Sequence, residues 1–341
     1  MSVLRAPGGI SLRWRARSLA VVTGCVLAAL ALGVLAVGGG DYPMSPADVL
    51  RTLTGGGTAA EEFIVGELRL PRLVTALGVG SALALAGAVV QSLLRNPLGS
   101  PDVLGITQGA ATGALVVVVG GGSSLTLAGA ALAGGLATGL LIRAVTGGRG
   151  LAGYRVVLVG IGVTAILTGV NGWLLTRAHL MDAARAVLWL TGSLDGRGWS
   201  QALPLLAVLA ALTPVLLAGA RALSMVELGD DTATALGVPV PRVRQALLAA
   251  AVLLASVAAA AAGPVSFVAL TAPHLARRLT RAPGPNLMAS ALVGAVLLVA
   301  ADLVAQRAFP DRQLPVGVVT GVLGGAYLVW LLAAQRRAGR S

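Results

Sequence analysis

The sequence predicts an all-α membrane protein, a polytopic bundle of about ten transmembrane helices, from its composition and from the spacing of its apolar segments. Hydrophobic residues make up 56% of the 341 residues and charged residues only 11%, whereas about a quarter of a soluble domain is charged. The mean hydropathy is +0.88. Apolar segments recur along the whole chain with short polar breaks, which excludes an ordinary soluble protein and favours one lipid-embedded domain.

The individual spans follow from length, because a helix needs about 20 apolar residues to cross a bilayer and fewer inside a bundle. The first apolar run is too long for the hydrophobic region of a typical signal peptide and predicts a retained helix. The spans form a permease domain over 18–333, between basic tails at 1–17 and 334–341. The expected spans are 18–37, 72–90, 104–121, 124–142, 156–175, 201–220, 246–262, 264–278, 287–305 and 314–333.

The orientation follows from the basic residues, all of which are arginine. An even number of spans puts both termini on one side of the membrane, and cytosolic segments carry the excess of positive charge. With the N-terminus inside, most of the 25 basic residues fall in cytosolic segments. We therefore expect both termini in the cytosol.

Several function classes are excluded by what the sequence lacks. The net charge of +12 does not indicate nucleic-acid binding, because the arginines lie between apolar spans and not on a face with polar or aromatic readers. The single cysteine, Cys25, offers no disulfide framework or thiol metal site. The sequence contains no P-loop pattern and no cluster of residues with metal-ligand spacing. We expect no cofactor, no metal and no catalysis by this chain.

A cytosolic loop over 95–105 reads R-N-P-L-G-S-P-D-V-L-G, in which two prolines stop one helix and aim the next. Together with other motifs it resembles the FecCD family of ATP-binding-cassette (ABC) importer permeases, which carry iron-siderophores, haem and vitamin B12. The loop and residues 189–199 look most like ferric-catecholate permeases. Gln313 departs from the family, which often has an acid at this position. The other matching segments are 69–72, 189–194, 228–237, 263–277 and 314–321.

This resemblance implies a permease subunit in the bacterial cytoplasmic membrane, driven by ATP hydrolysis in a separate subunit. The implied partners are a second permease, either identical or a paralogue, two ABC ATPase subunits, an extracytoplasmic binding protein that delivers an iron-siderophore, and membrane lipid. A cobalamin or haem permease remains an alternative, because the motifs serve assembly. An ion-coupled secondary transporter is an alternative of another class, disfavoured because Asp302 is the only acid expected within a span.

The segment 221–245 is a long polar cytosolic loop that is either a solvated connector or, as the resemblance implies, a pair of short coupling helices in a cleft of the ATPase. Acidic side chains would meet basic residues of the ATPase there, and small and apolar side chains would supply the rest of the contact. The expected coupling residues are Glu227, Leu228, Gly229, Asp230, Asp231, Ala233, Ala235, Leu236 and Gly237.

Arg69 and Arg72 are expected to be exposed outside the membrane at the start of a helix, where the helix dipole disfavours cations. They pair either with lipid phosphate and nearby glutamates over 61–67, or with acidic residues of the binding protein. The resemblance implies the second, with Arg307 as a third docking residue. Asp302 is expected to pair with Arg307.

The span over 156–175 carries Thr164, Thr168 and Asn171 on one helical face. Such side chains either bond to backbone carbonyls and neighbouring helices or line the translocation pathway. The resemblance places a cytosolic gate just before this span and completes the pathway set with Gly153, Tyr154 and Gly160. His274, at the cytosolic edge, is expected to make a structural hydrogen bond.

Overall fold

The computed structural model describes residues 2–5, 11–40, 42–122, 124–147, 153–309 and 313–338. Within them the chain is helical except for an antiparallel hairpin of β1 (Ser2–Arg5) and β2 (Ser11–Trp14). The longer helices are α1 (Ala16–Gly38), α4 (Leu70–Leu94), α5 (Ile106–Val119), α6 (Ser124–Thr146), α7 (Gly153–Arg177), α9 (Trp199–Glu227), α11 (Val240–Ala262), α12 (Val268–Thr280), α13 (Leu287–Arg307) and α14 (Val316–Ala338). The shorter ones are α2 (Pro46–Leu53), α3 (Ala59–Phe63), α8 (Leu180–Leu190), α10 (Asp230–Ala235) and the π-helical η1 (Ile64–Arg69).

Seven helices of the described ranges are long and apolar enough to cross a membrane. Each of the segments predicted as a span falls on one of the longer helices. However, α5 and the apolar part of α14 are shorter than the seven, and α12 has only 13 residues with Pro273 inside it. The all-helical membrane fold is therefore confirmed, and the count of ten spans stays a prediction.

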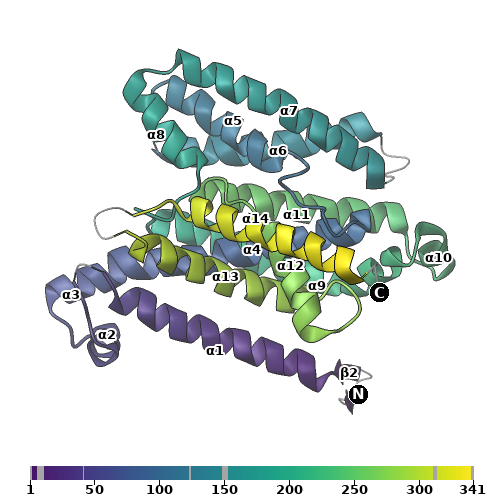
Figure 1. Ribbon diagram of the computed structural model, residues 1–341, viewed down its shortest axis with the longest axis horizontal. Helices are drawn as coiled ribbons and strands as arrows, with labels where there is room; N and C mark the ends of the chain where they lie inside the picture. The colour runs from purple at the N-terminus through teal and green to yellow at the C-terminus, as the bar shows by residue number, and fades with distance from the viewer. Residues whose placement is uncertain are drawn as a thin grey trace.

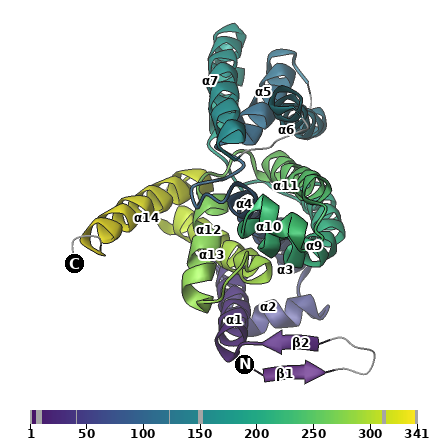
Figure 2. The same ribbon diagram turned by 90° about the vertical axis from the view of Figure 1, so that its right-hand side faces the viewer.

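The centre of the bundle is α4, surrounded by α9, α11, α12 and α13 (Figures 1 and 2). Its sequence is apolar and small on all sides, which is typical of a helix with no solvent or lipid face. Gly80 lies against the backbone of Gly294 in α13, and Gly87 lies against the backbone of Ala269 in α12, so that neither position has space for a side chain. Small residues thus bring the backbones together, as is usual for helices in lipid.

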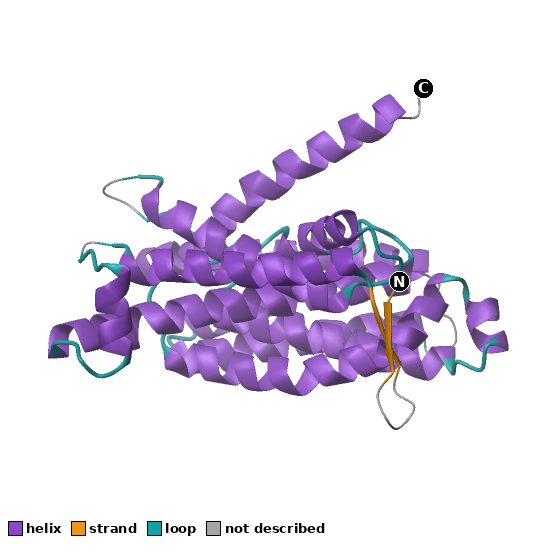
Figure 3. Cartoon of the chain, turned by 90° about the horizontal axis from the view of Figure 1, so that it is seen from below, coloured by secondary structure: helices purple, strands orange, loops and turns teal. Residues whose placement is uncertain are grey.

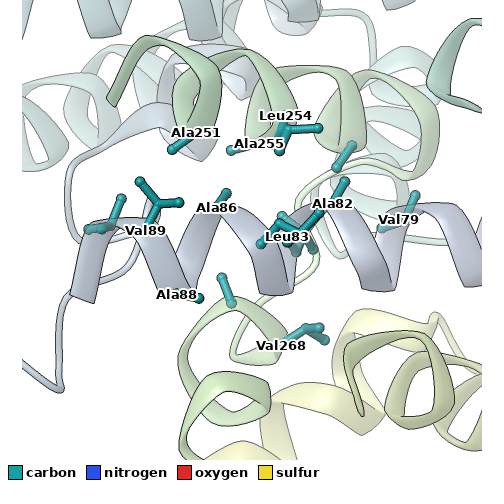
Figure 4. Close-up of a cluster of buried hydrophobic side chains, with 14 of the residues drawn as sticks. Val79, Ala82, Leu83, Ala86, Ala88, Val89, Ala251, Leu254, Ala255 and Val268 are labelled. Atoms are coloured by element: carbon teal, nitrogen blue, oxygen red, sulfur yellow. The ribbon is translucent and has the colours of Figure 1, made fainter. Parts of the chain in front are cut away.

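Buried side chains of α4 fill the space between α11 and α12 (Figure 4). Alternating small and branched residues let the helices interdigitate, which fixes the position of both ends of α4. The labelled members of this core are Val79, Ala82, Leu83, Ala86, Ala88, Val89, Ala251, Leu254, Ala255 and Val268.

The remaining helices lie around this core. The layer of α5 to α8 covers α11 on one side, and α1 lies along α13 on the other (Figures 1 and 2). α14 contacts α12 and α13 and then diverges from the bundle (Figure 3). α7 keeps large apolar side chains exposed, including Tyr154, Leu158 and Trp173. These outer faces can meet lipid or another subunit.

Candidate functional site

Arg72 lies in a cluster of polar side chains at the end of the core where α4 begins and α13 ends. Its Nη2 is 2.9 Å from Asp302 Oδ1 and its Nε donates to Asp302 Oδ2 at 3.0 Å, so the pair is bidentate between α4 and α13. Gln313 Oε1 accepts a third hydrogen bond at 3.0 Å. The side chains of Arg72 and Asp302 are only 16% and 6% exposed. Asp302 therefore pairs with Arg72, and the expected pairing with Arg307 is wrong.

The position of Arg69 and Arg72 in the chain also differs from the prediction. The π-turn η1 joins α3 to α4 in one continuous helix over Ala59–Leu94, so neither arginine lies at a helix start. Arg69 donates to Val37 O and Tyr42 O, both at 2.7 Å. Arg307 donates to Leu35 O at 3.2 Å. Both side chains bind carbonyls at or just beyond the end of α1, where cations are favourable.

A cavity of about 450 Å³ lies beside this cluster, and Arg69, Arg72 and Asp195 are among the residues that line it. The side chain of Asp195 is 70% exposed and lies 3.6 Å from Arg72 Nη1. Arg69, Arg72 and Arg307 all have partners within the chain. Arg69 and Arg72 are half-buried, so their expected exposure is wrong, while the docking role itself stays a prediction.

At the opposite end, α9 ends at Glu227 and the chain turns through Gly229 into α10. Gly229 has φ +120° and ψ 151°, a backbone conformation that is essentially limited to glycine. Gly237, after α10, has φ +83°. Of the pair of coupling helices expected between α9 and α11, the structure describes one, α10, because Leu228 and Gly229 form only a turn.

Asp230, the first residue of α10, is paired inside the chain. Its carboxylate accepts hydrogen bonds from Arg244 Nη1 at 3.1 Å and Nη2 at 2.8 Å, and Arg95 Nη2 lies 3.6 Å away. Ala233 is fully buried, whereas Leu228 and Leu236 are 68% and 58% exposed. The predicted coupling residues thus divide between an inward side and an outward side. Those on the outward side are Leu228, Asp231, Ala235, Leu236 and Gly237.

The loop over 95–105, which joins α4 to α5, contacts both α10 and α7. At its start Arg95 faces Asp230, and His274 Nε2 lies 2.9 Å from Pro97 O, which confirms the structural hydrogen bond expected of His274. At the end of the loop Leu104 packs against Gly160, where an added Cβ would lie 2.9 Å from Leu104 Cα. The loop therefore contacts the coupling segment at one end and the predicted pathway helix at the other.

The polar stripe of α7 mostly faces α5. The hydroxyls of Thr164 and Thr168 donate to carbonyls one turn earlier, both at 2.8 Å. Asn171 is 6% exposed, donates to Gln108 Oε1 at 3.0 Å and accepts from Thr112 Oγ1 at 2.6 Å. These contacts favour the interpretation as helix contacts for Asn171, and leave pathway lining as a prediction that rests on the exposed Thr168.

The predicted gate can be placed only in part. Tyr154 is 68% exposed, and Gly153 is the first residue of α7; residues 148–152 lie outside the described residues. In the described part of the chain no group of three or more His, Cys, Asp or Glu side chains is placed to hold a metal ion.

Comparison with known proteins identifies the chain through residues 26–334, which match the FecCD transport family. The chain belongs to this family. It is 43% identical to the ferric enterobactin transport system permease protein FepG of Escherichia coli (strain K12), over 96% of this chain and 98% of FepG. It is 37% identical to the Fe(3+) dicitrate transport system permease protein FecD of the same strain, over 92% of this chain and 96% of FecD.

Among solved structures, the fold resembles a metal-chelate type ABC transporter in an inward-facing conformation, with a TM-score of 0.84 and 26% identity. The similarity covers 93% of this chain and 99% of that one. With its family and its apolar helices, the protein is a multi-pass transport permease of the bacterial cytoplasmic membrane.

Proposed function

We propose that this chain is the permease subunit of an ABC importer that takes up iron-siderophore complexes, and that its substrate is a ferric catecholate. The observation that carries the proposal is the similarity to the enterobactin permease over almost the whole of both chains, which exceeds the similarity to the dicitrate permease. The sequence motifs at 95–105 and 189–199 support the same choice.

In the proposed topology the chain crosses the membrane ten times and both termini are cytosolic. The ten longer helices and the excess of arginine in the segments assigned to the cytosol support this arrangement. It puts α10 and the loop over 95–105 in the cytosol, and it puts the Arg72 cluster near the outer surface.

The proposed partners follow from these surfaces. Two ATPase subunits supply the energy, and one of them receives the outward side of α10, where Leu228 and Leu236 are exposed. A second permease, identical or a paralogue, packs against apolar faces such as that of α7. A binding protein docks at the outer end; a contact with Arg72 there would have a cost, since Asp302 would be left unpaired.

The coupling step rests on the contacts of Asp230. An ATPase that moves α10 displaces the carboxylate that Arg95 and Arg244 hold. Because Arg95 begins the loop whose other end packs on Gly160, the displacement is passed to α7 without any change in the core around α4. Interfaces of packed helices change between discrete arrangements, so a small shift of the loop can switch α7.

The proposal is tested with the complete transporter in proteoliposomes, loaded with ATP and supplied with its binding protein. Ferric enterobactin should be taken up in preference to ferric dicitrate, haem and cyanocobalamin, and uptake should stop when a non-hydrolysable ATP analogue replaces ATP. Preferential uptake of cyanocobalamin or haem would contradict the proposed substrate. Uptake driven by a proton or sodium gradient without ATP would contradict the proposed class.

A further inference from the structure

A groove of about 220 Å³ lies between α6 and α11, on the outside of the bundle. Its walls are apolar: Leu136 and Leu140 come from α6, and Leu248 and Val252 come from α11. Gly139 brings the two helices together at the floor, where an added Cβ would lie 2.6 Å from Val252 Cγ1. Leu140 is 66% exposed, so the groove is open on its outer side to the hydrocarbon of the bilayer.

Polar side chains are found at one end of this groove only. Arg143, one turn after Leu140, lies on one wall and Gln245 lies on the other. Arg242 precedes Gln245 by three residues and Ala249 by seven, so it continues the same face of α11 by one further turn. Both arginines are exposed. The groove is therefore apolar along its length and basic at its mouth.

Arg143 and Arg242 are charged but have no carboxylate partner in the described part of the chain. No acidic residue lines the groove, and among the described residues the side chains of Arg143 and Arg242 make no hydrogen bond, ion pair or ring contact. This differs from Arg72 and Arg244, which are both paired with aspartates. Guanidinium groups on two packed helices, without an internal counterion, are suited to bind a phosphate, which they can hold with paired hydrogen bonds.

The position of the basic mouth fits a lipid. Its basic mouth lies where α6 ends and α11 begins, the end of the bundle that carries α10, and the proposed topology places this end in the cytosol. The mouth is then at the level of the inner-leaflet headgroups and the apolar walls are at the level of the acyl chains. Basic pockets between membrane helices on this side are suited to anionic headgroups.

We propose that this groove is a binding site for one anionic phospholipid of the inner leaflet. One acyl chain lies between Leu140 and Leu248, and the phosphate accepts hydrogen bonds from Arg143 and Arg242. The side-chain amide of Gln245 donates to an oxygen of the same headgroup. A zwitterionic lipid fits the same walls but brings its own positive charge towards the two arginines, so the site selects by charge.

The assay is native mass spectrometry of the intact transporter complex in detergent, titrated with dioleoyl phosphatidylglycerol or with dioleoyl phosphatidylcholine. The first phosphatidylglycerol should bind about 30-fold more tightly than the first phosphatidylcholine, which corresponds to about 1 kcal/mol for each arginine. The double variant Arg143→Gln/Arg242→Gln should lose this preference. The matched control Arg221→Gln removes an exposed arginine from α9, away from the groove, and should keep it.

A second variant tests the apolar part of the site. Ala249→Phe places a ring in the groove and should weaken binding of both lipids, whereas Ala210→Phe, at an exposed position of α9, should not. Equal binding of the two lipids to the unmodified complex would overturn the proposal. A preference that survives the double arginine variant, or unchanged binding in Ala249→Phe, would also overturn it. Because lipid binding in detergent depends neither on the substrate nor on the leaflet, these outcomes are distinct from a failure of the proposed function.

Discussion

The two ends of α4 carry ionic clusters that differ in burial and in what they join. At the outer end, Arg72 and Asp302 join two long helices of the core, and the Asp302 side chain is 6% exposed. At the inner end, Asp230 is 42% exposed and joins the short α10 to Arg244 and Arg95. The first arrangement stabilises the helical core. The second, formed by Asp230 with Arg95 and Arg244, is a joint that can move, because glycines with positive φ flank α10.

The largest effect is expected from breaking the outer pair. Arg72→Ala leaves the Asp302 carboxylate buried without its partner, which should cost about 3–5 kcal/mol of stability and lower the thermal midpoint of the purified complex. The double variant Arg72→Glu/Arg69→Glu should be less stable still, so that the transporter fails to assemble even before docking of the binding protein is affected. Arg185→Ala removes an exposed arginine of α8 and should change little.

A further variant makes the first prediction sharper. Replacing both partners, as in Arg72→Met/Asp302→Leu, removes the charges together and should recover much of the stability lost in Arg72→Ala. If Arg72→Ala has the same thermal midpoint as the unmodified complex, the pair of Arg72 and Asp302 does not stabilise the core.

The next largest effect is expected at the inner joint. Gly229→Val forces a β-branched residue into a conformation with φ +120°, so α10 cannot keep its position. Uptake should fall below detection while the ATPase subunits still co-purify. Gly129→Val in α6 is the control, because an added Cβ at Gly129 meets nothing within 4 Å. Normal uptake by Gly229→Val would contradict the assignment of α10 as the coupling segment.

A smaller effect is expected on α7, at the far end of the joint. In a Cys25→Ser background, Thr168→Cys should react with a small charged thiol reagent and Asn171→Cys should not, because Thr168 is exposed and Asn171 is packed against α5. If the reaction rate of Thr168→Cys differs between nucleotide states, α7 moves together with α10. Equal reaction at both positions would show that α5 and α7 do not stay packed.

The smallest effect is expected from Asp102, in the loop between the two ends of the joint. Burial raises the pKa of its carboxyl above the ordinary value of 3.8, although a hydrogen bond from Thr107 opposes the shift. The folded protein therefore bears a cost of ionising Asp102 that is absent below pH 3.8 and grows above it. Asp102→Asn should raise the thermal midpoint by about 2 °C at pH 8 and leave it unchanged at pH 4; an equal gain at both pH values would contradict this cause.

The sequence predicts the helical segments well, because about 20 apolar residues in a row leave a chain few alternatives in lipid. The sequence does not predict the position of the helix start before α4 or the partners of the ion pairs. Arg69 and Arg72 look like a helix start because Pro71, a residue favoured in the first helical turn, lies between them, yet η1 (Ile64–Arg69) continues the helix from α3 into α4. Nothing local indicates that Arg72 pairs with Asp302, since the two residues are 230 positions apart.

The orientation of α10 is also not predictable from the sequence. The pattern of small, acidic and apolar residues over 228–237 predicts a coupling segment, but it does not say which side faces the core. The burial of Ala233 and the pairing of Asp230 with Arg244 decide this, and both depend on where α11 lies. Arg95 and Arg244 were not among the expected coupling residues. The turns at 228–229 and 236–237 contain Leu-Gly pairs, which are common at helix ends, whereas the positions of Arg95 and Arg244 depend on tertiary packing.

The most direct test of the joint is the number of siderophores imported for each ATP hydrolysed by the complete transporter in proteoliposomes. Arg95→Gln leaves Arg244 to hold Asp230 but removes the contact between α10 and the loop over 95–105. This variant should assemble and hydrolyse ATP at a normal rate, and its uptake per ATP should fall about tenfold, whereas Arg185→Gln, which changes an exposed arginine of α8, should keep the normal ratio. An unchanged ratio in Arg95→Gln would contradict the assignment of this contact as the link between the ATPase and α7.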